Sequence, residues 1–214
     1  ESIIGPVLRH TRSELSIQNT IVDAGRRSNV ALAAPDGAAA GAPLTIHNCT
    51  IVGKVHARKI SLASNTLFDA RLAAGDVWTA PVRSVQTQEG CVRFSYVPPE
   101  SITPRRHRCQ PDRELSIVRT ALLEENPAIT AAELSTARIN TIAKVAPAFV
   151  SRRYGDAAYM QLNPCVVALP TGADDESEMG AFHDVYAPQR IANLRSRLEE
   201  YLRFRLEAGV FHAS

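Results

Sequence analysis

The sequence predicts a mainly β fold, a right-handed parallel β-helix (a solenoid) followed by a helical or mixed C-terminal region. Three observations predict it. Apolar residues alternate with period two in short segments up to about residue 97, one strand phrase recurs three times around an Asn, and the period becomes helical from about residue 112. We therefore expect two domains, β-helix coils and a Pro-rich loop over 1–111 and a region ending in an amphipathic helix over 112–214.

Five short segments of the first half have the strand pattern. They are rich in β-branched residues, have turn-forming Asn, Asp or Gly at their ends, and read LSIQNTIV, LTIHNCTIV, KISLASNTLF, VWTAPVRSVQT and GCVRFSYV. Strands alone are also compatible with a sandwich or barrel of antiparallel hairpins, so the repeat has to decide between these architectures.

The repeated phrase is centred on Asn19, Asn48 and Asn65, each preceded by alternating residues and followed by further apolar residues. Asn tolerates the left-handed backbone region, so we expect each Asn to form a tight bend between two strands. Stacked coils would place the three Asn side chains within hydrogen-bonding reach of one another. Ile17 and Ile21 are then the expected rungs of a continuous core.

Three helices are expected in the second half. PDRELSIVRTALLEENP has one apolar face and Asp112 as its expected N-cap, while TAAELSTARINTIAKV begins with a Thr130–Glu133 capping box, although INTIAKV is also compatible with a strand. The last helix is predicted over about 188–208 and is stopped by Gly209. Its apolar stripe has to pack against the strands or against another subunit.

Composition excludes several classes of function. The net charge of +2 does not favour a nucleic-acid partner, and no apolar run reaches the length of a membrane span. The four cysteines lack the spacing of zinc ligands, and we expect buried free thiols, with a Cys91–Cys109 bridge as the alternative. No cofactor is expected, and both a cytoplasmic assembly and an extracellular particle are compatible with these features.

Two polar clusters are candidate interaction positions. Arg105, Arg106 and Arg108 stand in a Pro-rich loop and are expected either to bind an anion or to pair with acidic residues near the C-terminus. Asp174 and Asp175 open an acidic stretch that also contains Glu176, Glu178, His183 and Asp184. This composition suits a divalent ion or acid–base chemistry, but its spacing matches no known metal motif, so a solvated or Arg-paired turn is favoured and no catalytic or metal-binding residue is assigned.

A carbohydrate-active protein is the alternative, because many β-helix enzymes cleave acidic polysaccharides with clustered carboxylates, calcium and a basic residue. The charged residues near the repeat phrases that would line such a groove are Asp23, Arg58, Lys59, Asp69 and Arg71. Nothing in the sequence places two of these carboxylates on one face, so we expect no enzyme.

Three stretches of the second half carry a family resemblance: GCVRFSYVPPESITPRRHRCQPD, SRRYGDAAYMQL and GADDESEMGAFHDVYAPQRIANLRSRLEEYLRFRLEAGVF. They resemble the C-terminal region of uncharacterised bacterial right-handed β-helix proteins associated with phage-tail-like contractile injection systems. The resemblance implies a structural or interaction component of such a particle, baseplate-associated, fibre-like or surface-attached. Its expected partners are other protein subunits and a surface glycan, without nucleic acid.

Overall fold

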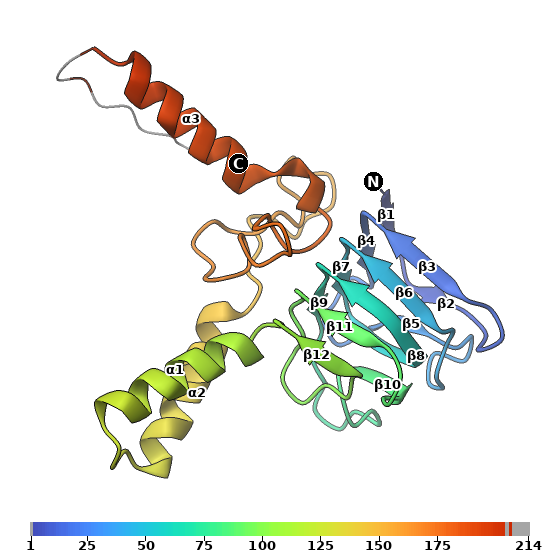
Figure 1. The fold of residues 1–214 in the computed structure, drawn as a ribbon. Coiled ribbons are helices and arrows are strands. Elements are labelled where there is room, and N and C mark those ends of the chain that lie inside the picture. Colours follow the sequence, from blue (N-terminus) through green and yellow to red (C-terminus); the bar gives the residue numbers. More distant parts are fainter. Residues whose placement is uncertain (1, 204–205, 207–214) are drawn as a thin grey trace.

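The computed structural model describes residues 2–203 and 206, and its strands form two parallel sheets (Figure 1). The smaller sheet has four strands in the order β1-β4-β7-β9. These strands are β1 (Ser2–Ile4), β4 (Thr20–Asp23), β7 (Thr50–Val52) and β9 (Leu67–Asp69). The repeated phrase accounts for three of them, because β4, β7 and β9 are the segments that follow the three Asn residues.

The larger sheet has eight strands and is joined by the long strand β8. Its strands are β2 (Val7–Leu8), β3 (Leu15–Gln18), β5 (Val30–Ala33), β6 (Leu44–His47), β8 (Lys54–Ser64), β10 (Val82–Gln86), β11 (Cys91–Arg93) and β12 (Arg105–His107). The first half of β8 pairs with β5 and β10, and its second half pairs with β6 and β11. One strand of 11 residues thus connects pairings that would otherwise form separate sheets.

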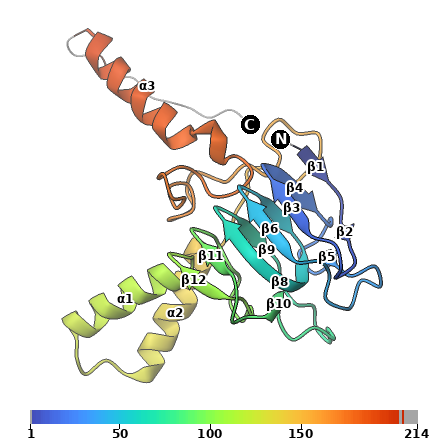
Figure 2. The same ribbon diagram turned by 45° about the vertical axis from the view of Figure 1, so that its right-hand side comes forward.

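Three helices lie outside the sheets. They are α1 (Asp112–Glu125), α2 (Ala131–Val145) and α3 (Ala187–Tyr201), and a short 3-10 turn, His183–Val185, precedes α3. Both ribbon views show α1 and α2 as a hairpin that projects from the strands, with α3 extending in another direction (Figures 1 and 2).

The helix predictions are confirmed with corrections at the ends. The Thr130–Glu133 capping box of α2 is present, and INTIAKV is helical. Asp112 is the first residue of α1, whose N-cap is Pro111. The last helix ends at Tyr201, earlier than predicted, and Gly209 lies outside the described residues.

The predicted fold class is wrong. The described residues form a mixed α/β structure with parallel sheets of four and eight strands and three helices, and not a mainly β right-handed β-helix or solenoid. The strand phrases do pair in parallel, with Ile17 opposite Ile46. The repeat specifies only which neighbouring strands pair. The continuous strand β8 pairs with β5, β6, β10 and β11 and thereby joins them in one large sheet.

The main core contains inward-facing residues of both sheets. Its members include Ile17, Val22, Ile46, Ile51 and Phe68, all nearly inaccessible to solvent. Ile17 is therefore a core position, as predicted. Ile21 is not part of this core, because side chains alternate along β4 and Ile21 faces the opposite side.

The outer face of the four-stranded sheet is covered by the segment 149–183. Ile21 and Val52 pack against Tyr159 and Met160 of this segment. A neighbouring cluster joins Leu67 and Tyr96 to Leu162, Leu169 and Met179. These contacts bury apolar surface and thereby hold the segment against the strands.

The four cysteines are free, and Cys49 and Cys109 are buried whereas Cys165 is exposed. The prediction of free thiols is confirmed, although not all of them are buried. Within residues 2–203, no helix is long and apolar enough to cross a membrane.

Candidate functional site

The three repeated Asn residues form a row of bends along one edge of the strands. Asn19, Asn48 and Asn65 have positive φ angles of 48°, 51° and 51°. Few residues other than Gly adopt this left-handed conformation, and Asn is among the most tolerant. The predicted bends are therefore confirmed. Stacking brings Asn65 Nδ2 to 3.3 Å from Asn48 Oδ1.

The row continues at two positions that the sequence did not reveal. Phe94 follows β11 and Arg108 follows β12, with φ angles of 46° and 48°. The strand registers place them in line with Asn65, because Arg93 pairs with both Ser64 and His107. The repeat was not recognised there because neither position is an Asn.

A loop from 173 to 186 lies across the row of Asn side chains, which donate to its carboxylates. Asn19 Nδ2 lies 2.6 Å from Asp184 Oδ2, and Asn48 Nδ2 lies 3.2 Å from Asp184 Oδ1. Asn65 Nδ2 donates to Asp174 Oδ1 at 2.7 Å. Two groups of candidate residues that lie more than 100 positions apart in the sequence thus meet at one site.

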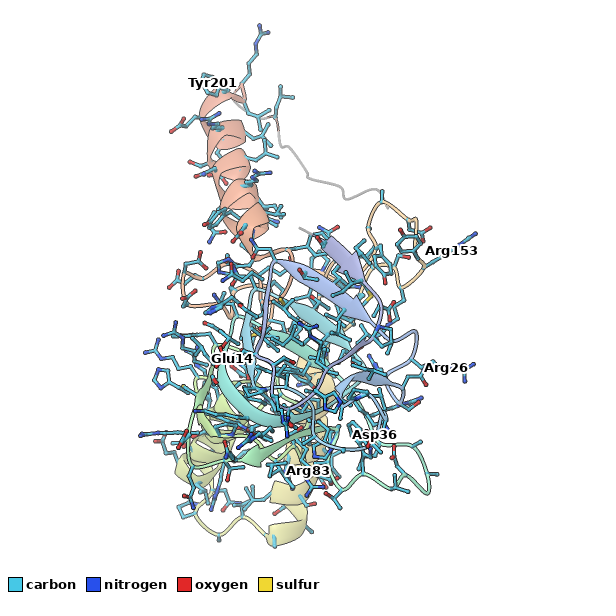
Figure 3. All side chains as sticks on the ribbon, turned by 90° about the vertical axis from the view of Figure 1, so that its right-hand side faces the viewer. Glu14, Arg26, Asp36, Arg83, Arg153 and Tyr201 are labelled. Atoms are coloured by element: carbon cyan, nitrogen blue, oxygen red, sulfur yellow. The ribbon has the colours of Figure 1, made fainter. Side chains whose placement is uncertain are left out.

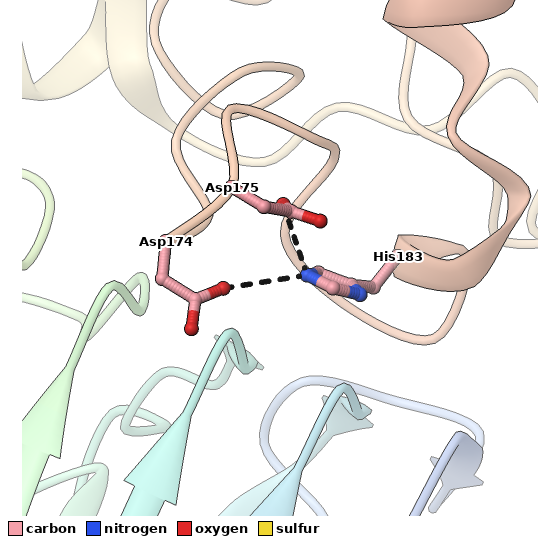
Figure 4. Close-up of side chains that lie close together, drawn as sticks. All are labelled: Asp174, Asp175 and His183. Atoms are coloured by element: carbon pink, nitrogen blue, oxygen red, sulfur yellow. Dashed lines mark ion pairs between the residues drawn. The ribbon is translucent and has the colours of Figure 1, made fainter.

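His183 is at the centre of this site and is only 7% exposed. Its Nδ1 lies 2.9 Å from Asp184 Oδ1. Its Nε2 lies 3.2 Å from Asp175 Oδ1 and 3.6 Å from Asp174 Oδ1, as Figure 4 shows. The sequence placed His183 in the acidic stretch but provided no sign that it would be buried against the Asn bends.

The carboxylate of Asp175 is held in its ionised form. Burial alone raises its pKa, but hydrogen bonds from the hydroxyl and the backbone amide of Ser177, together with His183, bring the pKa below its usual value. The backbone amide of Ser177 lies 3.0 Å from Asp175 Oδ1, so the loop itself orients this carboxylate. The site consequently keeps a negative charge beside His183 Nε2.

Backbone contacts fix the loop on the strands. The Gly180 amide donates to the Asn65 carbonyl at 2.8 Å, and the Ala181 amide donates to Thr50 Oγ1 at 3.0 Å. Gly180 has a φ of 106°, and a Cβ there would lie 2.6 Å from Thr50 Oγ1. Only glycine permits this close approach without a shift of the strand.

Glu178 is the most buried carboxylate of the loop, at 5% exposure. Burial raises its pKa to about 7, although the Leu162 amide partly opposes this by donating to Oε1 at 3.3 Å. Glu178 faces the interior of the segment 149–183 and is not one of the three side chains that converge at His183. Its role is therefore structural.

The three arginines that were predicted to act together, Arg105, Arg106 and Arg108, lie in different environments. Arg106 Nη1 pairs with Asp112 Oδ2 at 3.1 Å, so it contacts the start of α1 and not the acidic residues near the C-terminus. Arg108 lines an open groove beside the Asn row, which Phe94, Arg113, Asp174 and Glu176 also line. Arg105 is exposed on β12.

The two carboxylates expected to line an enzyme groove, Asp23 and Asp69, have structural partners instead. Asp23 Oδ2 accepts a hydrogen bond from the Tyr159 hydroxyl at 2.5 Å, and Asp69 pairs with Arg27 and Arg152 at 2.7 and 2.6 Å. Each of these pairs attaches another part of the chain to the outer sheet face. Within the described residues, neither carboxylate belongs to a group of three side chains that could hold a metal ion.

A comparison with protein-family models, curated proteins and solved structures finds no match to this chain. Neither the mixed α/β fold with parallel sheets nor this comparison points to an injection system, so the assignment to a phage-tail-like particle is withdrawn. Membership of the family named above stays a prediction.

Proposed function

We propose that this chain is a structural and interaction component of a larger protein assembly. The observation that carries the proposal is that α1 and α3 have no buried residue, although both have apolar side chains. Amphipathic helices of this length are marginal in water unless their apolar face is covered. A partner subunit would supply that cover.

Of these two helices, α3 is the stronger candidate for contact with a partner subunit. Leu194 is 45% exposed and Tyr201 is 84% exposed, and they lie on the same side as Ile191 and Leu198 because the spacing is three or four residues. Figure 3 shows Tyr201 far from the strands, near the outer end of the helix. A helix with this face matches the groove-binding mode of helical recognition.

Open strand edges are a second feature that suits an assembly. β1 is at the end of the four-stranded sheet, and β2 is at one end of the larger sheet. Ile3 and Leu8 of these strands are 48% and 42% exposed. Unpaired edges of this kind pair readily with other chains unless something covers them.

Isolation of the chain from its source cells under non-denaturing conditions tests the proposal. We expect the chain in a complex of fixed composition, from which the double variant Leu194→Glu, Tyr201→Glu is released. The double variant Asn193→Glu, Ser196→Glu is the matched control, because it adds the same two negative charges to the other side of α3. Recovery of the wild-type chain alone, or equal retention of all variants, would contradict the proposal.

A carbohydrate-active protein is the second candidate, and the groove beside the Asn row favours it. Arg108 and Arg113 line this groove together with Glu114, Asp174 and Glu176, and such a mixed set of charged groups can hydrogen-bond to the hydroxyl and carboxylate groups of a sugar. Binding and turnover assays on acidic polysaccharides, with and without calcium, separate the two candidates. Turnover that is lost in Asp174→Ala would favour the enzyme over the structural role.

A further inference from the structure

The side chains of Asp174, Asp175 and His183 converge on one point. One ligand atom from each lies within 4.8 Å of the others. The imidazole comes from the 3-10 turn before α3 and the carboxylates from the preceding loop, as Figure 4 shows. His183 is buried, whereas both aspartates reach the surface. A small ligand therefore has access to the point from the carboxylate side.

The tautomer of His183 follows from its partners. Asp184 Oδ1 lies 2.9 Å from Nδ1, and this carboxylate is itself held by Asn19 and Asn48. Because an ionised carboxylate only accepts hydrogen bonds, Nδ1 has to carry a proton. In the neutral ring, Nε2 then has a lone pair. This lone pair faces the carboxylates of Asp174 and Asp175. Carboxylate–histidine pairs of this form orient metal-binding imidazoles.

The side-chain amide of Asn65 has more acceptors around it than it has hydrogens. Asn65 Nδ2 has two hydrogens but lies near three acceptors: Asp174 Oδ1 at 2.7 Å, His183 Nε2 at 3.1 Å and Asn48 Oδ1 at 3.3 Å. The amide cannot be reversed, because Asn65 Oδ1 accepts from the Asp174 backbone amide at 3.2 Å. One acceptor is therefore left without a hydrogen.

A proton on Nε2 also removes this nitrogen from the acceptors and can donate to Asp175 Oδ1, but it leaves two N–H donors, Nε2 and Asn65 Nδ2, 3.1 Å apart. A metal ion on Nε2 removes His183 from the acceptors of Asn65, so that two hydrogens serve the two remaining acceptors. It also compensates negative charge, since no Lys or Arg of residues 2–203 lies within 4.0 Å of the Asp174, Asp175 or Asp184 carboxylates.

We propose that Asp174, Asp175 and His183 bind a divalent transition-metal ion, with Zn²⁺ as the best fit. Ligands of a tetrahedral zinc ion lie about 3.3 Å apart. The distances from Nε2 to the two carboxylate oxygens, 3.2 and 3.6 Å, bracket this value. A fourth position toward solvent is open to water or to a ligand from a partner.

The ligand types separate zinc from the hard cations. Calcium prefers six to eight oxygen ligands and magnesium retains several waters, whereas imidazole nitrogen suits zinc and its neighbours. The Asp184 carboxylate, held by Asn19 and Asn48, orients the imidazole by accepting from Nδ1. The ion would join the two parts of the loop that carry its ligands and stabilise the conformation in which the loop meets the row of bends.

Zinc titration of the full chain by calorimetry tests the proposal. The chain is first dialysed against a chelator, and the reference chain and every variant carry Cys165→Ser, because an exposed thiol can itself bind zinc. The test variants are Asp174→Asn and Asp175→Asn, which keep an acceptor oxygen for Asn65 and Ser177. Glu176→Gln is the matched control, because this exposed residue of the same loop is not one of the three ligands.

We expect one zinc ion per chain, a loss of affinity of at least about 10-fold in each Asp variant, and wild-type affinity in Glu176→Gln. The NMR signal of His183 Nε2 should shift on addition of one equivalent of zinc. Absence of stoichiometric binding, equal affinities in all variants, or an unchanged Nε2 signal would overturn the proposal. Tighter binding of calcium than of zinc would overturn the choice of ion.

Discussion

Asn65 and Asp174 exchange two hydrogen bonds, although 109 residues separate them: Asn65 Nδ2 donates to Asp174 Oδ1 at 2.7 Å, and the Asp174 amide donates to Asn65 Oδ1 at 3.2 Å. Asn65 is 4% exposed, so water does not readily replace these bonds. The residue that forms a strand bend is thus also the residue that anchors the acidic loop.

Replacing Asn65 should separate its two roles. Asn65→Gly keeps the left-handed bend but removes the amide, and we expect a loss of about 1 to 3 kcal/mol in the free energy of unfolding. Asn65→Ala should lose roughly 1 to 2 kcal/mol more, because Ala is strained at a φ of 51°. Urea unfolding measures both. A glycine variant as stable as the wild type would refute the anchoring role.

Glu178 should make stability depend on pH. Its pKa in the folded chain is about 7, above the ordinary value of 4.5, so the folded state binds its proton more tightly than the unfolded state. This contribution is complete below pH 4.5 and is lost as the pH rises through about 7. Glu178→Gln keeps the acceptor for Leu162 and should be more stable than the wild type at pH 8, by roughly 2 to 4 kcal/mol.

Urea unfolding from pH 4 to pH 8 checks this prediction. Glu176→Gln, which changes an exposed residue two positions away, should follow the wild-type curve. Parallel curves for Glu178→Gln and the wild type would show that Glu178 is not buried as described.

Two lysine–carboxylate pairs of equal length should differ in their contribution to stability. Lys54–Asp76 and Lys59–Glu89 both measure 2.5 Å, but the side chains of the first pair are 8% and 7% exposed and those of the second 27% and 68%. Lys54→Met leaves the Asp76 carboxylate without its counter-ion and with only the Ala73 and Trp78 amides as donors, which should cost about 3 to 5 kcal/mol. Lys59→Met should cost no more than about 1 kcal/mol. Equal losses in thermal unfolding experiments would contradict the burial of the first pair.

Leucine-to-alanine substitutions should destabilise the chain in the segment 149–183 but not in α3. Leu169 is fully buried, and Leu169→Ala should cost about 2 to 5 kcal/mol. Leu194 is 45% exposed, and Leu194→Ala should change the stability of the isolated chain by about 0.5 kcal/mol or less. A large loss for Leu194→Ala would show that α3 packs on its own chain and would remove the main support for a partner.

The sequence predicted local features well, because their causes are local. Period-two alternation and a tolerance for positive φ were enough to locate most of the strands and the bends at Asn19, Asn48 and Asn65, but not the short strands β1, β2, β5 and β12. A capping box was enough to start α2 at the correct residue. The fold class was wrong because the repeat carries no information on how β8 connects its neighbours.

The site could not be predicted as a unit. Asp174, Asp175 and the Asn residues were each singled out, but their contact depends on how the segment 149–183 folds over the outer sheet face. That packing involves residues such as Met160 and Leu169, which show no periodicity in the sequence. The burial of His183 has the same origin, and no local pattern indicates it.

A double-mutant cycle between Asn65 and Asp174 measures how strongly the row of bends holds the acidic loop. Asn65→Gly, Asp174→Ala and the double variant are unfolded with urea in the presence of a chelator, so that metal binding does not contribute. We expect a coupling energy between about 0.5 and 3 kcal/mol. Free-energy losses that add within about 0.5 kcal/mol would contradict this expectation.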